Sequence, residues 1–293
     1  MSGVTLTVQS AMTEATRLLK RAGVEEAGND ARRLLSAVLG LSSAQLLGSP
    51  EARLTAEQAD TFARYVARRA TREPVSRILG EREFYGRTFK LSPTTLDPRP
   101  DSETLIEVTL GFVDQAGLRA APLRILDVGT GSGCLLTTLL CELPAATGIG
   151  TDISQDALHM ASDNAQRLGV AARATWKIAD ALENVEGPFD ILVCNPPYIR
   201  SAVISELEPE VRDFDPRAAL DGGSDGLAIY RRMASRIPAL VPDGWAVFEV
   251  GYDQAEAVAD LLASATGARN PPSLSLHLDV AGKRRCVAWG TRA

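Results

Sequence analysis

The stretch ILDVGTGSGC, residues 125–134, sets a glycine-rich loop between an apolar strand and the start of a helix. Glycine lets the backbone turn tightly and approach a ligand closely, and a helix N-terminus offers free amide donors. The spacing is G-x-G-x-G, which does not meet the G-x-G-x-x-G pattern of dinucleotide-binding loops. Taken alone, the loop indicates a nucleotide-like ligand and does not exclude a dinucleotide. Its candidate ligand-binding residues are Gly129, Thr130, Gly131, Ser132 and Gly133.

Around this loop, strand-like and helix-like segments alternate from about residue 123 to the C-terminus. Such alternation predicts an α/β fold with a mostly parallel sheet wrapped by helices. The expected strands cover residues 123–128, 148–152, 174–178, 189–194 and 245–250, and the expected helices cover 133–143, 154–168, 227–240 and 254–265. Two closing strands flank Gly282 and should be antiparallel, because a short turn joins them.

Aspartates stand at or just before the ends of three expected strands. Asp127 precedes the glycine loop, where its carboxylate can accept from a cationic amino group. Asp152 ends the next strand, where an acid can accept from both hydroxyls of a ribose, although it could also cap the following helix. Asp180 could bond an adenine amino group or be a turn residue. Together these acids indicate a nucleoside that carries an amino acid, which is the shape of S-adenosylmethionine.

A second polar loop follows the apolar run 189–194, where the chain continues as Asn195-Pro196-Pro197-Tyr198. Two prolines cannot continue a central strand, and they stiffen the chain at the strand's carboxyl end. The loop therefore holds the Asn195 amide, the Pro196 carbonyl and the Tyr198 ring in fixed positions. Such a set suits a planar NH2 group, which needs two acceptors and a flat partner. The alternative is a rigid structural turn with no chemical role.

The first 80 residues or so show apolar residues at helical spacing, which predicts a small helical bundle. The expected helices run from Val8 to Ala22, from a cap at Asn29 or Asp30 to Gly40, and from a cap at Thr55 to a point before Pro74. The third helix carries arginines at i, i+4 spacing, Arg64, Arg68 and Arg72. These arginines predict either a solvated helix face or a docking surface for a macromolecular partner.

Between the two regions, residues 84–91 suggest a hairpin around Gly86, and a proline-rich connector follows at residues 98–103. Asp101 or Ser102 can cap the helix that begins there. The domain boundary is expected between residues 80 and 100.

The overall composition narrows the class of protein. The 293 residues are 45% apolar and 23% charged, which is ordinary for a soluble globular protein. No apolar run approaches the ~20 residues that span a bilayer, and the N-terminus does not resemble a signal peptide, so we expect a cytoplasmic protein. The four cysteines form no CxxC and there are two histidines, which gives little support for a metal site. A net charge of −6 argues against tight, nonspecific nucleic-acid binding.

With these motifs in place, the chain resembles the class I S-adenosylmethionine-dependent methyltransferases, and more narrowly the HemK/PrmC family of peptide chain release factor glutamine methyltransferases. The resemblance covers nearly the whole chain. Its motifs are Arg69 with Glu73-Pro74-Val75, the segment 80–86, the connector PRPDSE at 98–103, the GTGSG and NPPY loops, DPRAALDGG at 215–223, and Glu249-Val250-Gly251 with Gln254. NPPY is shared with enzymes that methylate adenine, whereas the connector and the segment after NPPY are more specific.

The resemblance implies a Rossmann-like, mostly parallel seven-stranded sheet with an antiparallel C-terminal hairpin, plus an N-terminal helical bundle. Residues 1–80 would dock the substrate, 81–100 would form the hairpin and linker, and 101–293 would form the methyltransferase domain. The implied reaction methylates the side-chain amide nitrogen of the glutamine in a Gly-Gly-Gln sequence of class I release factors. The glycine loop and Asp152 would hold the cofactor, Asn195 would lie between cofactor and substrate, and residues 195–198 would contact the glutamine.

The chain departs from the family pattern at a few positions. Asp97 stands where isoleucine is common, Ser102 where threonine is common, and Asp215 where glutamate is common. Ala181 stands where an aromatic residue often packs on the adenine, so only its backbone is expected to contact the ligand.

Two other functions fit parts of the sequence. An enzyme that methylates an exocyclic amine of a DNA or RNA base needs the same pair of acceptors as NPPY supplies, but flipping a base calls for more basic and aromatic surface than this chain has. A non-catalytic binding module built on a vestigial fold is disfavoured by the intact Asn195 and glycine loop.

Overall fold

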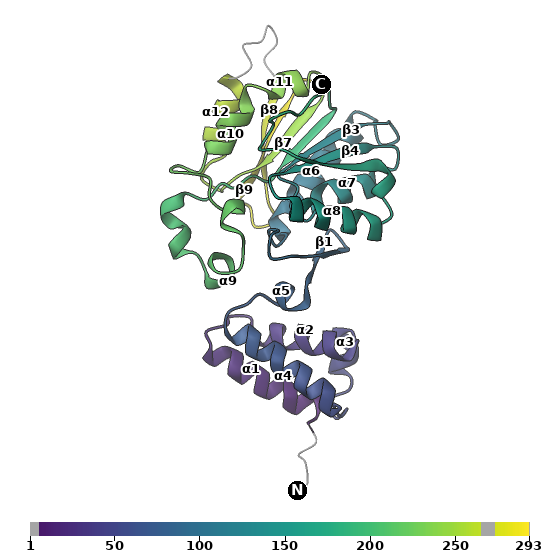
Figure 1. The fold of residues 1–293 in the computed structure, drawn as a ribbon, viewed down its shortest axis with the longest axis vertical. Coiled ribbons are helices and arrows are strands. Elements are labelled where there is room, and N and C mark those ends of the chain that lie inside the picture. The colour runs from purple at the N-terminus through teal and green to yellow at the C-terminus, as the bar shows by residue number, and fades with distance from the viewer. Residues whose placement is uncertain (1–5, 265–272, 293) are drawn as a thin grey trace. The chain divides into compact units, whose positions relative to one another are not determined.

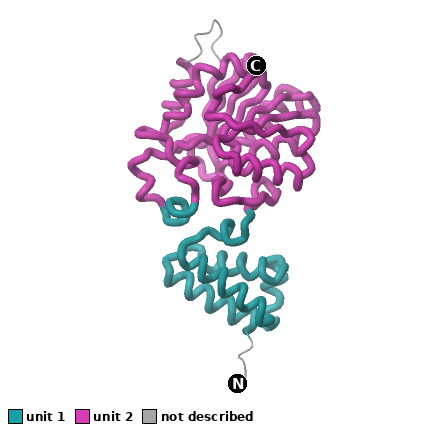
Figure 2. Tube along the Cα trace, in the orientation of Figure 1, with its two compact units in different colours: residues 1–81, 208–214 teal, residues 82–207, 215–293 magenta. Residues whose placement is uncertain are grey.

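The structure is a computed structural model that describes residues 6–264 and 273–292. The chain divides into two compact units, shown in Figure 2. The helical unit comprises residues 1–81 and 208–214, and the sheet unit comprises residues 82–207 and 215–293. The segment 208–214 therefore leaves the sheet unit, packs within the helical unit and returns.

The helical unit is built from short amphipathic helices. They are α1 (Val8–Arg21), α2 (Ala27–Leu39), α3 (Ser43–Leu47), α4 (Ala56–Ala70), α5 (Val75–Leu79) and, in the returning segment, α9 (Pro209–Arg212). Capping boxes at Thr7, Ser42 and Thr55 begin α1, α3 and α4, so the expected cap at Thr55 is present. The apolar faces of α1, α2 and α4 enclose one core that includes Leu19, Leu34 and Phe62.

The expected cap of the second helix at Asn29 or Asp30 is wrong. Helix α2 begins at Ala27, and its N-cap Glu26 makes no side-chain capping bond. The Asp30 carboxylate is buried instead and accepts from Arg69 Nε at 2.7 Å. A buried carboxylate gains more from a guanidinium partner than from a free helix amide, because the pair neutralises its charge.

The sheet unit contains a seven-stranded sheet (Figure 1). Its strands lie in the order β5-β4-β3-β6-β7-β9-β8. The strands are β3 (Arg124–Val128), β4 (Thr147–Asp152), β5 (Ala174–Ile178), β6 (Ile191–Cys194), β7 (Trp245–Glu249), β8 (Ser273–Leu278) and β9 (Arg284–Gly290). The pairs from β5 to β7 are parallel, and β9 runs antiparallel to both β7 and β8. The predicted sheet and its antiparallel closing pair are confirmed.

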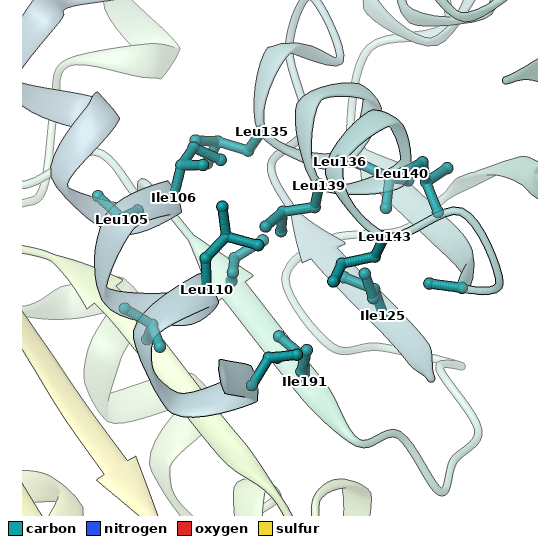
Figure 3. Close-up of a cluster of buried hydrophobic side chains, with 14 of the residues drawn as sticks. Leu105, Ile106, Leu110, Ile125, Leu135, Leu136, Leu139, Leu140, Leu143 and Ile191 are labelled. Carbon is teal, nitrogen blue, oxygen red and sulfur yellow. The ribbon is translucent and has the colours of Figure 1, made fainter. Parts of the chain in front are cut away.

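Helices cover both faces of this sheet. They are α6 (Glu103–Gln115), α7 (Cys134–Glu142), α8 (Gln155–Arg167), α10 (Ala228–Ala234), α11 (Ile237–Leu240) and α12 (Ala255–Ser264). Successive strand residues point to opposite faces, so Ile125 and Ile191 join the core under α6 and α7, as Figure 3 shows, while Leu126 and Leu192 join the core under α10 and α12. Burial on both faces explains why β6 is apolar throughout and why β3 carries apolar residues at successive positions, Ile125 and Leu126.

The remaining elements are short. A two-stranded sheet of β1 (Glu81–Phe84) and β2 (Arg87–Lys90) lies outside the main sheet. Single 3₁₀ turns are η1 (Pro100–Ser102), η2 (Ala171–Arg173), η3 (Ser201–Glu206) and η4 (Arg217–Ala219).

One predicted helix, 227–240, is wrong as a continuous element. It is two helices, α10 and α11, separated at Ser235 and Arg236. Pro238 follows at the second position of α11, where its missing N–H is tolerated, but it could not sit inside a longer helix without removing a hydrogen bond. The last residue of another expected helix, Ala265, lies outside the described residues.

Candidate active site

The site forms where the direction of strand order reverses. The chain moves outward from β3 through β4 to β5, then returns to β6 on the other side of β3. Val128 and Cys194 are register partners, so the glycine loop after β3 and the NPPY loop after β6 leave the sheet side by side. Ligands of open α/β sheets bind in the crevice at such a point. A cavity of about 410 Å³ lies there, within the range of small-molecule sites.

Eight predicted site residues line this cavity. They are Gly129, Gly131, Asp152, Asp180, Ala181, Asn195, Pro196 and Pro197. The other predicted residues, Asp127, Thr130, Ser132, Gly133 and Tyr198, belong to the same two loops or to the strand before them but are not among the lining residues.

The glycine loop is held from beneath by Asp127, which is fully buried. Its Oδ2 accepts from the Thr130 hydroxyl at 2.6 Å and from the Leu136 amide at 3.3 Å. Its Oδ1 is buried and has no partner among the described residues. Burial raises the pKa of Asp127 to about 7, although the bond from Thr130 acts in the opposite direction. Asp127 therefore shapes the loop, and its second oxygen is free to accept from a cationic group.

Gly131 and Gly133 show why the loop needs glycine. Gly131 has φ +55° and its amide donates to Asp152 Oδ2 at 2.9 Å, so the loop is tied to the neighbouring strand. Gly133 has φ +78°, and a Cβ there would lie 2.9 Å from the Cβ of Ala161 on α8. The glycine thus allows both the left-handed backbone and the close approach of two helices.

Asp152 and Asp180 line the cavity from the ends of neighbouring strands. Asp152 Oδ1 accepts from the Ser154 amide at 2.9 Å, so the residue has a local role in the turn as well as facing the cavity. Asp180 is paired with Arg232 of α10 at 2.8 Å. Both carboxylates keep further acceptor capacity, since each oxygen carries two lone pairs.

The NPPY loop presents two oxygens without partners. Among the residues that the structure describes, none donates to Asn195 Oδ1 or to the Pro196 carbonyl oxygen. The Asn195 Nδ2 group donates to Ser102 Oγ at 3.0 Å. The Tyr198 hydroxyl donates to Glu249 Oε1 at 3.1 Å, and burial raises the pKa of Tyr198 so that it keeps its proton. The loop therefore offers two acceptors beside a fixed aromatic ring.

Ser102 and Glu249 belong to this site, and sequence reasoning gave neither a role there. Asp101 or Ser102 was expected to cap α6. Ser102 stands at the N-cap position, but its side chain makes no capping bond and its hydroxyl donates to Glu249 Oε2 at 2.5 Å. Glu249 closes the otherwise apolar strand WAVFE and is buried. Burial raises its pKa, while the bond from Ser102 and the charge of Arg285 act against the shift. Glu249 is the one acid in an otherwise apolar central strand, and that pattern could have indicated a role for it in the site.

Two loops complete the cavity wall. One contributes Pro93, Thr94 and Leu96, and the other contributes Pro216, Ala218 and Ala219. The buried Asp215 joins them, because its carboxylate accepts from the Asp97 amide and from the Arg99 guanidinium. The cavity is also lined by Ile153, Ser154 and Ile229, which no motif had indicated.

Charges elsewhere in the described ranges, 6–264 and 273–292, do not form a metal site, since no cluster of three His, Cys, Asp or Glu could hold an ion. The helices of the same ranges include none with the length and apolarity needed to cross a membrane.

Comparison with known proteins agrees with this geometry. The family model described as the PrmC N-terminal domain matches residues 10–80, and the methyltransferase small domain matches residues 115–207. A release factor glutamine methyltransferase from Rhodospirillum rubrum is 47% identical over 94% of this chain and 82% of that protein. A protein of the same name from Bradyrhizobium diazoefficiens is 43% identical over 96% of this chain and 94% of that protein.

A solved structure supports the fold alone. The hMettl16 catalytic domain in complex with MAT2A 3'UTR hairpin 6 has a TM-score of 0.56 at 15% identity, over 78% of this chain and 82% of that chain. The fold and the cavity at its switch point are those of a class I methyltransferase. Within that class, the chain belongs to the family of release factor glutamine methyltransferases.

The cofactor of this class, S-adenosylmethionine, fits the residues of the cavity. The unpartnered Asp127 Oδ1 suits the ammonium of its methionine part, and Asp152 suits its ribose hydroxyls. Apolar surface from Ile153, Ala179 and Ile229 suits a flat base.

Proposed function

We propose that this protein transfers a methyl group from S-adenosylmethionine to the side-chain amide nitrogen of the glutamine in the Gly-Gly-Gln sequence of class I peptide chain release factors. The observation that carries the proposal is the pair of unpartnered oxygens on Asn195 and Pro196 at a cofactor cavity. A carboxamide NH2 has two protons to donate, so it needs two acceptors. The names of the relatives indicate the glutamine of a release factor as its source.

The chemical difficulty is that an amide nitrogen is a poor nucleophile, because its lone pair is delocalised into the carbonyl. S-adenosylmethionine, when bound, supplies an electrophilic methyl group on a sulfonium sulfur. Asn195 Oδ1 and the Pro196 carbonyl oxygen would each hold one N–H of the substrate, and Tyr198 would pack on the amide plane. The lone pair is thereby aimed at the cofactor side of the cavity.

The same acceptors would act during transfer. As the nitrogen gives up its lone pair it becomes more positive, and its two N–H groups become better donors. The bonds to Asn195 and Pro196 then strengthen, which stabilises the developing charge more than the ground state. A strong general base is not required, because the methylated nitrogen is acidic enough to lose its proton.

We assign the remaining residues accordingly. Asp127 with the glycine loop, Gly129 to Gly133, would hold the methionine part, Asp152 the ribose, and Asp180 with the Ala181 backbone the adenine. The catalytic residues would be Asn195, Pro196 and Tyr198, and Pro197 would complete the glutamine site. The N-terminal residues 1–80 would dock the release factor, 81–100 would connect, and 101–293 would carry the reaction, in the cytoplasm where release factors act.

A transfer assay with labelled S-adenosylmethionine tests the proposal. The acceptors are a class I release factor, the same factor with Gly-Gly-Ala in place of Gly-Gly-Gln, and adenine-containing DNA and RNA. We expect label only in the Gly-Gly-Gln factor. Label in nucleic acid and not in the factor would instead support methylation of an exocyclic base amine.

A further inference from the structure

A chain of buried polar side chains leads from Asn195 through Ser102 to Glu249. Asn195 Nδ2 lies 3.0 Å from Ser102 Oγ, and Ser102 Oγ lies 2.5 Å from Glu249 Oε2. We propose that Glu249, acting through Ser102, is a positioning residue that determines which atom of the Asn195 carboxamide faces the substrate. The proposal rests on the proposed function in that the substrate presents an NH2 group.

The direction of each hydrogen bond follows from counting protons. Burial raises the pKa of Glu249, but the bonds from Ser102 and Tyr198 and the charge of Arg285 oppose that rise, and both carboxyl oxygens of Glu249 accept. As a carboxylate it has no proton to donate, so the single Ser102 hydroxyl proton must point at it. The Ser102 oxygen can then only accept, and the Asn195 group that faces it must be the NH2. A reversed carboxamide would set two oxygens against each other with no proton between them. Oδ1 is therefore the atom left for the cavity that Asn195 lines.

Burial makes this arrangement strict. Ser102 is 2% exposed and Glu249 is 1% exposed, so water does not replace a lost partner. In such surroundings an unpaired polar group is costly and a satisfied network is rigid. The Glu249 backbone is held too, because the Tyr230 hydroxyl donates to its carbonyl at 2.6 Å.

The same carboxylate also holds Tyr198, whose hydroxyl donates to Oε1. One side chain on β7 thus orders both polar side chains of the NPPY loop, Asn195 and Tyr198. Its two oxygens are divided between them, one through Ser102 and one directly. Glu249 touches neither substrate nor cofactor in this arrangement, so its effect on the reaction is indirect.

The consequence for catalysis is specific. If the carboxamide of Asn195 turned over, its NH2 would face the NH2 of the substrate, donor against donor. The substrate nitrogen would lose one of its two acceptors and the orientation of its lone pair. Loss of one such hydrogen bond lowers kcat roughly tenfold to a hundredfold.

We call the hydrogen-bonded chain from Glu249 through Ser102 to Asn195 the relay. Four variants test it in methylation of the Gly-Gly-Gln factor. Ser102→Ala removes the hydroxyl, and Glu249→Gln supplies an NH2 that can donate to Ser102 and free its proton for Asn195. We expect each to lower kcat roughly tenfold to a hundredfold, with the Kd for S-adenosylmethionine within about twofold of the unchanged protein. The kcat of the double variant should be no lower than that of the more impaired single variant, because both changes break the same hydrogen-bonded chain. Ser102→Thr keeps the hydroxyl and should stay within about threefold.

The control is Glu256→Gln on α12, an exposed carboxylate paired with Arg284 outside the site, which should leave kcat unchanged. Thermal denaturation of each variant separates loss of fold from loss of orientation. The relay is wrong if Ser102→Ala and Glu249→Gln retain full kcat, if their losses multiply in the double variant, or if Ser102→Thr is as impaired as Ser102→Ala.

Failure of the proposed function has a different signature. If the unchanged protein methylates an adenine substrate and not the release factor, the proposed substrate is wrong. The kcat values of the variants are then compared on the adenine substrate, whose amino group needs the same acceptor. The outcomes given above for the release factor decide on the relay there too. A protein that methylates neither substrate would overturn both proposals.

Discussion

Glu249 and Glu210 are two carboxylates that each accept from two side chains, yet their pKa values move in opposite directions. Glu249, in the sheet unit, accepts from the hydroxyls of Ser102 and Tyr198, and burial raises its pKa. Glu210, in the helical unit, is also partly buried, but guanidinium bonds from Arg72 and Arg69 hold its pKa below the usual value. Both carboxylates are well satisfied, and they differ in whether their donors carry charge.

The difference separates two uses of a buried acid. Neutral hydroxyl donors leave the charge of Glu249 in place, and that charge orders the protons of its neighbours. Arginine donors neutralise the charge of Glu210 and fasten α9 to the helices of its unit. The first arrangement serves orientation in a reaction, and the second serves the attachment of a chain segment. Changes at the two places should therefore affect different measured quantities.

The largest effect is expected from Asn195→Ala. This change removes an acceptor and the end point of the Glu249 relay, so we expect kcat to fall by roughly a thousandfold or more. Binding of S-adenosylmethionine, measured by calorimetry, should remain detectable because Asp127, Asp152 and the glycine loop are intact. Undiminished turnover would contradict the role given to Asn195.

The helical unit should respond to Arg69→Ala through stability. Arg69 is 6% exposed and binds both Asp30 and Glu210, so its loss leaves two carboxylates without their shared partner. Breaking a buried ion pair costs about 3–5 kcal/mol of unfolding free energy. Urea unfolding measures the change, and Arg17→Ala, which breaks an exposed pair with Glu14, is the matched control at about 0.5 kcal/mol or less. Equal losses of unfolding free energy in Arg69→Ala and Arg17→Ala would contradict the role of Arg69 as a buried ion-pair partner.

A pH-dependent effect, comparable at most to that of Arg69→Ala, is expected at Asp127. Its pKa is raised from 3.8 to about 7, so the folded protein keeps a proton that the unfolded chain has lost. The contribution of this group is fully present below its unfolded pKa and is lost as pH rises to about 7, by up to about 1.4 kcal/mol per pH unit. The unfolding free energies of the ligand-free protein and of Asp127→Asn, determined in steps of about one pH unit from pH 4 to pH 8, measure this contribution. The difference between the two should change up to about pH 7 and then level off.

The smallest effect is expected at Glu210, with the opposite sign. Its pKa is lowered, so its contribution is present above the usual value of 4.5 and is lost as pH falls through the folded value. Glu210→Gln should cost about 1 kcal/mol near neutral pH and less in acid, where the unchanged protein loses the same charge. Glu14→Gln serves as the exposed control. A cost that grew in acid would contradict the assignment.

The parts of the fold that sequence could predict are those with strong local patterns. Residues 125–134 combine an apolar strand with a glycine loop, and residues 189–198 end an apolar strand at two prolines, so the strands and the crevice between them were predictable. Gly282 between two β-rich segments predicted the closing pair. Helix 227–240 failed because apolar spacing continues across Pro238, whose effect on the backbone depends on its position within a turn.

The parts that sequence could not predict are those that depend on contacts between distant residues. Ser102 looked like a helix cap, and only the fold brings Glu249, 147 positions away, close enough to accept a hydrogen bond from its hydroxyl. Asp30 also looked like a cap, because its partner Arg69 is 39 positions away and only the fold brings the two together. The lining residues Ile153 and Ile229 are ordinary apolar residues, and only their placement at the cavity distinguishes them.

The returning segment 208–214 has a consequence for the order of synthesis. Arg69 and Arg72 are made early, but Glu210, their common partner, follows 141 and 138 positions later. Residues 82–207, more than half of the sheet unit, precede Glu210 in the chain and include the glycine loop and the NPPY loop. The helical unit therefore completes its charge cluster only after most of the cofactor cavity has been synthesised. A fragment that ends at residue 81 would contain Arg69 and Arg72 but lack Glu210, the carboxylate that both of them bind.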